Sequence, residues 1–321
     1  MKQTVNHNID ILKYIMSIMI IMIHTGFTPQ MPILRTAVPV FFIISSYLFF
    51  HKIHTIDKNQ IKLTYKKFLL RASKLYLFWF IVFFPVTYKV RHLGEMELLS
   101  MIKTLIMRVF LQSTFPGSWY ISAYVIGISI ALILKNYNKC LCILGILSYL
   151  FCCLISNYGN VYYIQNFNWG GIDWENSFLA GIIFVFIGKI LAETDNRSLT
   201  IGIIGIIIGY FLLHIESEYV AINCLRKADD CYLSLMILAP GIFITTLALP
   251  NSIKSSTLYI RNMSTIYYCS HISLLHVLHA FLGDLQKTVL LVTVIILCTI
   301  LSLVLIGLSK FRYLHWLKYS Y

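Results

Sequence analysis

Charged residues are scarce in this sequence, since Asp, Glu, Lys and Arg together make up only 12% of its 321 residues. Hydrophobic residues make up 58% and aromatic residues 15%, and the mean hydropathy is +0.76. A soluble domain carries about twice that share of charged residues, because polar groups must cover its surface. The composition therefore excludes a soluble globular protein and predicts an all-α, polytopic membrane protein.

The sequence also lacks a cysteine framework, an internal repeat and a long linker. Its eight cysteines show no metal-ligand spacing with histidine, so we expect no metal site. Only Cys224 and Cys231 lie together in a predicted outer loop, where an oxidising compartment would permit a disulfide. The preferred prediction is that both remain free thiols. We treat residues 1–321 as a single transmembrane domain.

Apolar segments long enough to form membrane-crossing helices occur at ten places, of which the second and seventh are the shortest. With the N-terminus inside, most of the 26 Lys and Arg residues fall in segments on the cytoplasmic side, so both termini are predicted to be cytoplasmic. The predicted spans lie near residues 9–26, 37–50, 68–88, 106 or 119–134, 140–156, 176–191, 201–213, 232–250, 259–282 and 289–308.

The first of these segments contains two ionisable residues, Lys13 and His24, eleven positions apart. On an α-helix this spacing is three turns plus about 20°, so both side chains share a face, about 16 Å apart along the axis. Asp10 and Ser17 fall on the same stripe. Because an ionisable group facing lipid is costly, the stripe is predicted to line a hydrated interior. The alternative is a closed polar network in which Asp10 neutralises Lys13.

Four short blocks of sequence share the order of one known family. They are NIDILKYIMSIMIIMIH, RTAVPVFFIISSYLFF, SWYISAY and MSTIYYCSH. Together they resemble the acyltransferase 3 family of membrane proteins, with Lys13 in place of an Arg, Ser46 in place of a Gly and Thr265 in place of a Tyr. The second block also resembles the membrane domain of vancomycin-resistance-type serine racemases, a branch of that family associated with serine uptake.

The resemblance implies ten helices in a bacterial cytoplasmic membrane. It also implies transfer of an acyl group, commonly acetyl from acetyl-CoA, onto a hydroxyl of a sugar, polysaccharide or other envelope molecule. Acyl-CoA would be a donor substrate, and no tightly bound cofactor is expected. Because a hydroxyl is a weak nucleophile at neutral pH, the reaction needs a base. His24 is the predicted base, since the pKa of imidazole lies near 6.5. His271 is predicted to orient the acceptor or His24, although a helix-packing role is equally compatible.

The donor is predicted to bind at the most basic segment of the chain, residues 51–76. Lys66, Lys67 and Arg71 would hold the phosphates of CoA there, together with Lys13. Membrane topology and attraction to anionic lipid headgroups explain the same cluster without a ligand. Nucleic acid is not expected as a partner, because this loop is held at the bilayer surface.

The acceptor is predicted to contact Arg35, Trp119, Tyr120 and Glu175. The two aromatic rings would stack on a saccharide, or else form part of the aromatic belt at the membrane interface. Glu175 lies in a polar outer loop, and Arg35 either balances a charge near His24 or marks the membrane boundary. A carrier for a small polar solute such as serine is the alternative function, although the inverted repeats and broken helices of many carriers are not evident.

Overall fold

The computed structural model describes residues 6–27, 31–161, 173–194, 197–223, 231–251 and 256–321, and within these ranges the ordered elements are all helical. The all-α prediction is thus confirmed. The helices are α1 His7–Thr25, α2 Ala37–His54, α3 Lys58–Val82, α4 Phe84–Val90, α5 Leu98–Leu111, α6 Trp119–Ile133, α7 Asn138–Ile155, α8 Asn157–Val161, α9 Phe178–Thr194, α10 Leu199–Asn223, α11 Leu235–Ala248, α12 Leu258–Leu282 and α13 Lys287–Leu308. Short 3₁₀ helices, among them η1 Pro32–Thr36, η4 Trp174–Asn176 and η5 Arg312–Ser320, connect or follow them.

Five of the described helices are long and apolar enough to cross a membrane. They are α1, α2 with η1, α7, α10 and α13, and the pair α3–α4 makes a sixth if its two parts form one broken span. The helices α6 and α11 are apolar but shorter. A multi-pass membrane protein follows from these spans, while the count of ten crossings stays a prediction.

The structure shows a bend in the predicted third span, confirms the second of the two predicted starts for the fourth, and corrects the seventh. The third bends by 67° at the junction of α3 and α4, where Pro85 occupies the first turn of α4. In the fourth, α6 begins at Trp119 and α5 is a separate helix that buries none of its residues. The seventh, α10, continues to Asn223 through a stretch that the sequence pattern assigned to an outer loop starting at His214.

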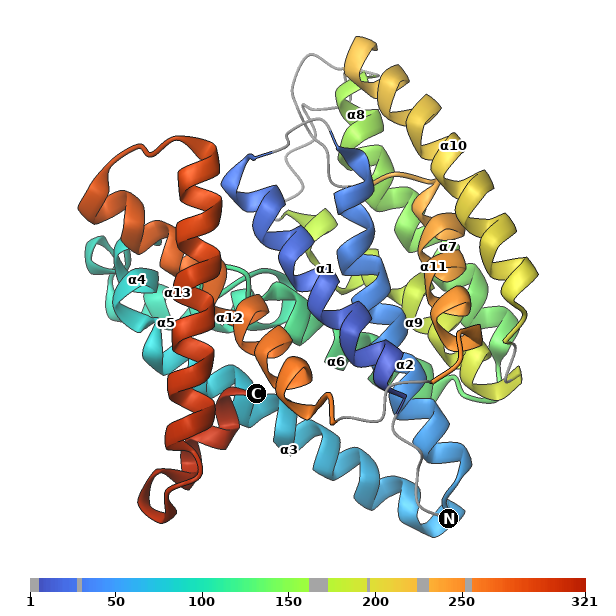
Figure 1. Cartoon of the computed structure of the whole chain (residues 1–321), viewed down its shortest axis with the longest axis horizontal. Helices are drawn as coiled ribbons and strands as arrows, with labels where there is room; N and C mark the ends of the chain where they lie inside the picture. The colour runs from blue at the N-terminus through green and yellow to red at the C-terminus, as the bar shows by residue number, and fades with distance from the viewer. Residues whose placement is uncertain (1–5, 28–30, 162–172, 195–196, 224–230, 252–255) are drawn as a thin grey trace.

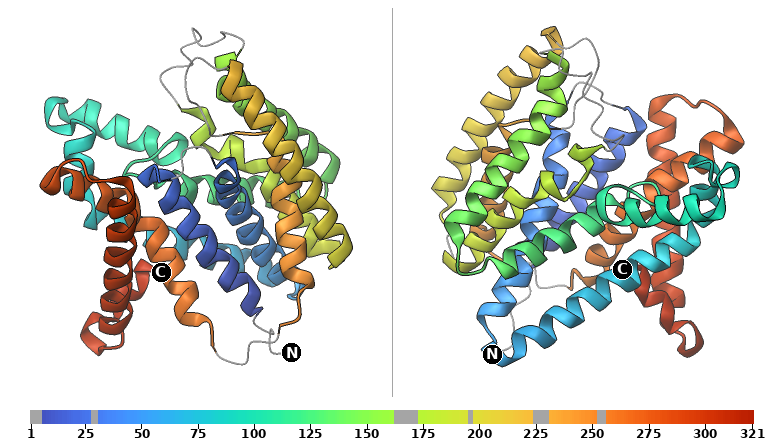
Figure 2. Two further views of the ribbon diagram at one scale, coloured as in Figure 1. Left: turned by 45° about the horizontal axis from the view of Figure 1, so that its top comes forward. Right: turned by 180° about the vertical axis from the view of Figure 1, so that it is seen from behind.

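The helix α1 lies at the centre of the molecule, between α2 and α12 (Figure 1). On the α2 side, α9 packs against α2, α6 and α7, and α10 covers α11 at the edge. On the other side, α12 packs against α13. Figure 2 shows the same arrangement from two further directions. The first helix is therefore in a position to present polar groups to the protein interior.

Glycines of α10 allow a close approach to α11. A Cβ atom at Gly209 would lie 2.7 Å from Leu238 Cα, and one at Gly205 would lie 3.1 Å from Gly241 Cα. A larger residue at either place would push the two helices apart, since the obstacle is backbone. These glycines serve helix packing.

A buried ion pair connects three helices at one end of the bundle. Lys189 of α9 is fully buried and pairs with Glu193 at 2.5 Å, while its ammonium donates to Asn138 Oδ1 at 2.5 Å. Glu193 also lies 3.7 Å from His54 at the end of α2. Because a buried charge needs a partner, this network fixes α2, α7 and α9 together.

Candidate functional site

Two cavities lie inside the helix bundle. The first, called the His24 cavity, has a volume of about 220 Å³, and its polar and aromatic lining includes His24, Arg35, Trp119, Glu175, Asn176 and His271. The second, called the Lys13 cavity, has a volume of about 370 Å³, and its lining includes Lys13, Lys52, Lys67, Arg71, Tyr120 and Tyr124. Among the described residues, Tyr268 alone lines both cavities.

The polar stripe of α1 divides between these two cavities. His24 lines one and Lys13 lines the other, so residues on one helix face reach two separate spaces. Asp10 and Ser17 are buried between helices instead: Asp10 accepts a hydrogen bond from Thr257 at 2.6 Å, and Ser17 donates to the carbonyl of Tyr14 at 2.7 Å. Asp10 forms no ion pair with Lys13 in the described part of the chain.

The His24 cavity brings two imidazoles together. The rings of His24 and His271 lie 5.2 Å apart, centroid to centroid, with an angle of 42° between their planes. His24 is exposed to the cavity near the end of α1, whereas His271 is only 2% exposed and comes from α12. The packing of α1 against α12 therefore creates this pair.

The hydrogen bonds of His271 determine which ring nitrogen carries its proton. Its Nδ1 lies 3.0 Å from the carbonyl oxygen of Tyr267 and 2.8 Å from that of Tyr268. Because carbonyl oxygens only accept, Nδ1 is the N–H donor, and Nε2 of the neutral ring is left with a lone pair. Nε2 is buried and has no hydrogen-bond partner in the described part of the protein. It can therefore accept a hydrogen bond from a ligand in the cavity.

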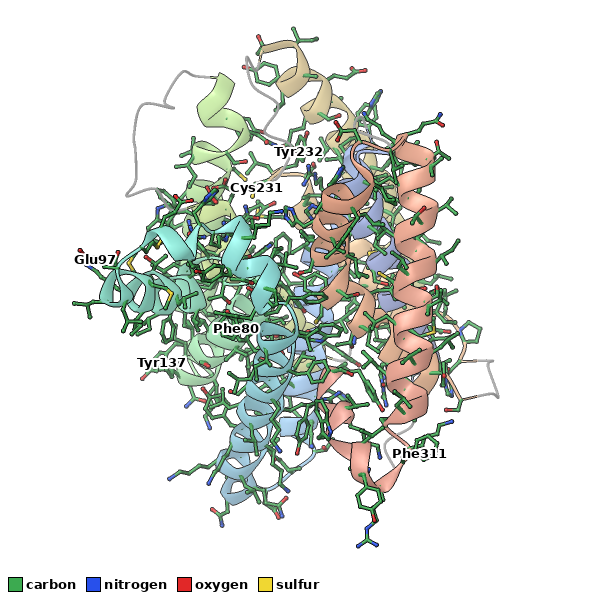
Figure 3. The ribbon with its side chains drawn as sticks, turned by 90° about the vertical axis from the view of Figure 1, so that its left-hand side faces the viewer. Phe80, Glu97, Tyr137, Cys231, Tyr232 and Phe311 are labelled. Atoms are coloured by element: carbon green, nitrogen blue, oxygen red, sulfur yellow. The ribbon has the colours of Figure 1, made fainter. Side chains whose placement is uncertain are left out.

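Other helices bring the predicted acceptor-binding residues to the same cavity. Arg35 comes from η1, Trp119 is the first residue of α6, and Glu175 belongs to η4. All three are half-buried. Cys231, which also lines this cavity, is labelled in Figure 3 next to Tyr232. Cys224, its possible disulfide partner, lies outside the described residues.

The start of α11 at this cavity is held by a carboxylate from α10. Glu216 accepts hydrogen bonds from the amides of Leu233 and Ser234, at 2.6 and 2.9 Å, and from the hydroxyl of Tyr158 at 2.6 Å. A negative charge at a helix N-terminus is favourable, because the first amides have no partner within the helix. Glu216 thus fixes the chain that leads from Cys231 into α11.

The Lys13 cavity combines four cationic side chains with aromatic walls. Lys67 and Arg71 come from α3, one helical turn apart, and Lys52 comes from the end of α2. Lys13 has no hydrogen-bond or ion-pair partner within the described ranges. Unpaired cations around a cavity of this size suit a ligand with several negative charges.

The structure separates two pairs of neighbouring residues that the sequence analysis grouped. Lys67 lines the Lys13 cavity, whereas Lys66 is exposed and lines neither cavity. Trp119 lines the His24 cavity, whereas Tyr120 is buried and lines the Lys13 cavity. Sequence reasoning missed Tyr268, whose position in the MSTIYYCSH block was the available signal.

A model of the acyltransferase 3 family, described as an acyltransferase domain, matches residues 6–308. The chain therefore belongs to the acyltransferase 3 family. It is also similar to a protein named "Amino-acid racemase" from Enterococcus faecalis, with 23% identity over 347 residues that cover 97% of this chain and 47% of that protein. The chain thus spans about half the length of this curated relative. No solved structure matches it.

These findings define a multi-pass membrane protein of a family whose description suggests acyltransferase activity. The predicted resemblance is confirmed for the family and for a racemase-named relative.

Proposed function

We propose that the protein is an O-acyltransferase of the bacterial cytoplasmic membrane. It moves an acetyl or other short acyl group from acyl-CoA to a hydroxyl of a sugar, polysaccharide or other envelope molecule. The main support is the division of the α1 stripe, because His24 and Lys13 line different cavities. A reaction between a cytoplasmic donor and an acceptor on the other side needs two binding spaces that adjoin each other.

The Lys13 cavity is the proposed donor site. In the ten-span arrangement with both termini in the cytoplasm, it opens toward the cytoplasmic side, where acyl-CoA is found. Lys67, Arg71 and Lys52 would bind the phosphates, since charge-assisted hydrogen bonds to phosphate are strong. Lys13 lies deeper along α1 and would contact the polar groups of the pantetheine chain, which carries the acyl end toward His24. Lys66 lies apart from this cavity and would act only through its long-range charge.

The His24 cavity is the proposed acceptor site. His24 acts as general base and removes the proton of the acceptor hydroxyl while the oxygen attacks the thioester carbonyl carbon. The carbon–sulfur bond then breaks, and the CoA thiolate takes up a proton as it leaves. The lone pair on His271 Nε2 is in place to accept a hydrogen bond from His24 or from the acceptor. Arg35, Glu175 and Trp119 would bind the rest of the acceptor.

A second candidate is a carrier for a small polar solute such as serine. Two observations favour it. The chain is similar to a protein named as an amino-acid racemase over 97% of its own length, and two separate cavities that adjoin each other also suit alternating access. A carrier would move its solute without consuming acyl-CoA, so the two functions differ in a direct measurement.

The test uses purified protein in proteoliposomes with radiolabelled acetyl-CoA and extracted envelope glycans. Wild type is compared with His24→Ala and with a matched control, His279→Ala, because His279 is on α12, lines neither cavity and faces Asp284 at 3.5 Å. Label transfer by wild type and the control but not by His24→Ala supports the proposal. Equal transfer by His24→Ala contradicts it. Uptake of labelled serine without release of CoA identifies a carrier.

A further inference from the structure

A partition of four aromatic rings separates the two cavities. Phe42 lines the His24 cavity, Phe41 and Tyr120 line the Lys13 cavity, and Tyr268 lines both. The ring centroids of Tyr120 and Tyr268 are 5.1 Å apart, those of Phe41 and Tyr268 are 5.8 Å apart, and those of Phe42 and Tyr120 are 4.8 Å apart. These edge-to-face contacts lie between two cavities that are separate and have only Tyr268 in common among the described residues.

Both phenols of the partition are held by hydrogen bonds. The hydroxyl of Tyr120 has two partners, the carbonyl of Phe41 at 2.9 Å and Ser45 Oγ at 2.8 Å. The hydroxyl of Tyr268 donates to the carbonyl of Gly117 at 3.0 Å, and the backbone amide of Tyr120 also interacts with it. Of the two phenols in the partition, only Tyr268 lines both cavities, so a turn of its ring would connect them.

The partner of Tyr268 belongs to the connection between α5 and α6. Gly117 has a φ of +83°, in the left-handed region that favours glycine, and a Cβ atom there would lie 3.1 Å from Ile272 Cδ1. The glycine thus turns its carbonyl toward Tyr268 while the chain passes close to α12. A single neutral hydrogen bond of this kind contributes little net free energy, so it acts as a latch that a ligand can displace.

Tyr268 is also linked to the histidine pair. Its carbonyl accepts a hydrogen bond from His271 Nδ1 at 2.8 Å, and the two rings lie 6.0 Å apart, centroid to centroid. Both residues are on the same turn of α12. A rotation of the Tyr268 side chain would therefore open the partition directly beside the proposed acceptor site.

We propose that Tyr268 is the gate between the two cavities. In the closed position its ring blocks the path from the Lys13 cavity to His24, and its hydroxyl holds it to Gly117. When the ring turns, the acyl end of the donor passes through the partition and reaches the acceptor. That the passing ligand is the acyl donor rests on the proposed function. That Tyr268 separates the cavities is inferred from the two cavities and the rings between them. A closed gate keeps water in the His24 cavity from hydrolysing the thioester.

The test measures access across the partition without any catalysis. A reporter thiol is introduced as Ile23→Cys, since Ile23 lines the His24 cavity. Oriented vesicles receive a membrane-impermeant methanethiosulfonate on the side of the Lys13 cavity, and labelling at position 23 is read by mass spectrometry, so that the native cysteines can stay. We expect slow labelling in the reporter protein and rapid labelling when Tyr268→Ala is added.

Tyr268→Phe is the second variant, because it keeps the ring and removes only the latch. Its labelling rate should rise about fivefold, the ratio that corresponds to one neutral hydrogen bond. The matched control is Tyr267→Phe, since Tyr267 is the preceding residue on α12, is fully buried, lines neither cavity and bonds to Thr299 at 2.6 Å. The control should label at the reporter rate.

Labelling from the opposite side is measured on every variant and should not change, which shows that the His24 cavity is intact. Unchanged access in Tyr268→Phe and in any folded Tyr268→Ala protein overturns the gate. Because labelling needs no turnover, the result is independent of the transfer assay. A raised rate in a protein that transfers no acyl group would leave the gate standing and contradict the proposed function alone.

Discussion

The imidazole ring of His24 on α1 lies 5.2 Å from that of His271 on α12, and the only hydrogen-bond donor of the neutral His271 ring points away, to two carbonyls of its own helix. The protein thus holds one histidine in a fixed tautomer next to a second that is exposed to a cavity. A fixed hydrogen-bond acceptor next to a general base can orient that base, which helps when the base must remove a proton from a hydroxyl.

Substitutions of His271 should separate its two nitrogens. His271→Asn can keep the hydrogen bond to the carbonyls but removes the acceptor at the Nε2 position, so we expect acyl transfer to fall about tenfold, the effect of one lost hydrogen bond to a polar partner. His271→Gln can place an oxygen near Nε2 and should recover part of kcat. Steady-state kinetics with acceptor as the varied substrate measure both. Equal losses in the two variants would indicate a packing role.

Lys13 should affect the donor more than the acceptor. Lys13→Met removes an ammonium that has no hydrogen-bond or ion-pair partner among the described residues, so we expect the KM for acyl-CoA to rise about tenfold, as for one charge-assisted hydrogen bond. Lys13→Arg keeps the charge and should be closer to wild type, since an Arg can bind the same groups in a different geometry. The acceptor KM is measured alongside, and a change confined to it contradicts the donor assignment.

The neighbours Lys66 and Lys67 give a matched pair of substitutions on α3. Lys67→Ala should raise the KM for acyl-CoA, because Lys67 lines the Lys13 cavity, whereas Lys66→Ala should have a smaller effect, because Lys66 does not. Both changes remove one positive charge from the same surface. If bilayer attraction alone explains the basic segment, the two variants will behave alike in kinetics and in binding to anionic vesicles.

The ion pair of Lys189 and Glu193 should matter for stability. Glu193→Ala leaves the fully buried Lys189 ammonium without its carboxylate, and loss of one partner of a buried pair costs about 3 kcal/mol. We expect a lower unfolding temperature in detergent, with unchanged acyl transfer per folded molecule. The double variant Lys189→Met with Glu193→Ala should be more stable than Glu193→Ala, since the unpaired charge is gone. A double variant that is less stable would show that the ammonium itself is not the cost.

The arrangement of α1 was accessible from sequence because helical periodicity and the cost of exposing charge to lipid act on the same few residues. Lys13 and His24 had to face inward, and the spacing put them on one face. Such local rules hold wherever one helix determines the outcome.

The sequence did not predict which of two neighbouring residues lines which cavity. Trp119 and Tyr120 are adjacent in the sequence. Which of the two cavities each ring lines depends on how α2 and α12 pack against α6. Glu216, which the sequence pattern placed in a loop, lies on α10, and its three hydrogen-bond partners come from outside that helix. A polar stretch at a helix end resembles a loop until its hydrogen-bond partners are known.

Glu216 provides a test of how the outer part of the His24 cavity is held. In Glu216→Gln the amide offers one acceptor oxygen where the carboxylate has two, so one of the Leu233 and Ser234 amides loses its partner, at a cost of about 2 kcal/mol. We expect a lower unfolding temperature and faster amide hydrogen exchange at residues 231–236. Glu218→Gln is the control, because Glu218 is exposed on the same helix and pairs with the exposed His214 at 3.4 Å, an interaction that contributes little. Since Cys231 and Leu235 line the cavity, a looser α11 should raise the KM for the acceptor and leave that for acyl-CoA unchanged. Equal exchange in the two variants would mean that α11 begins at Leu235 without help from α10.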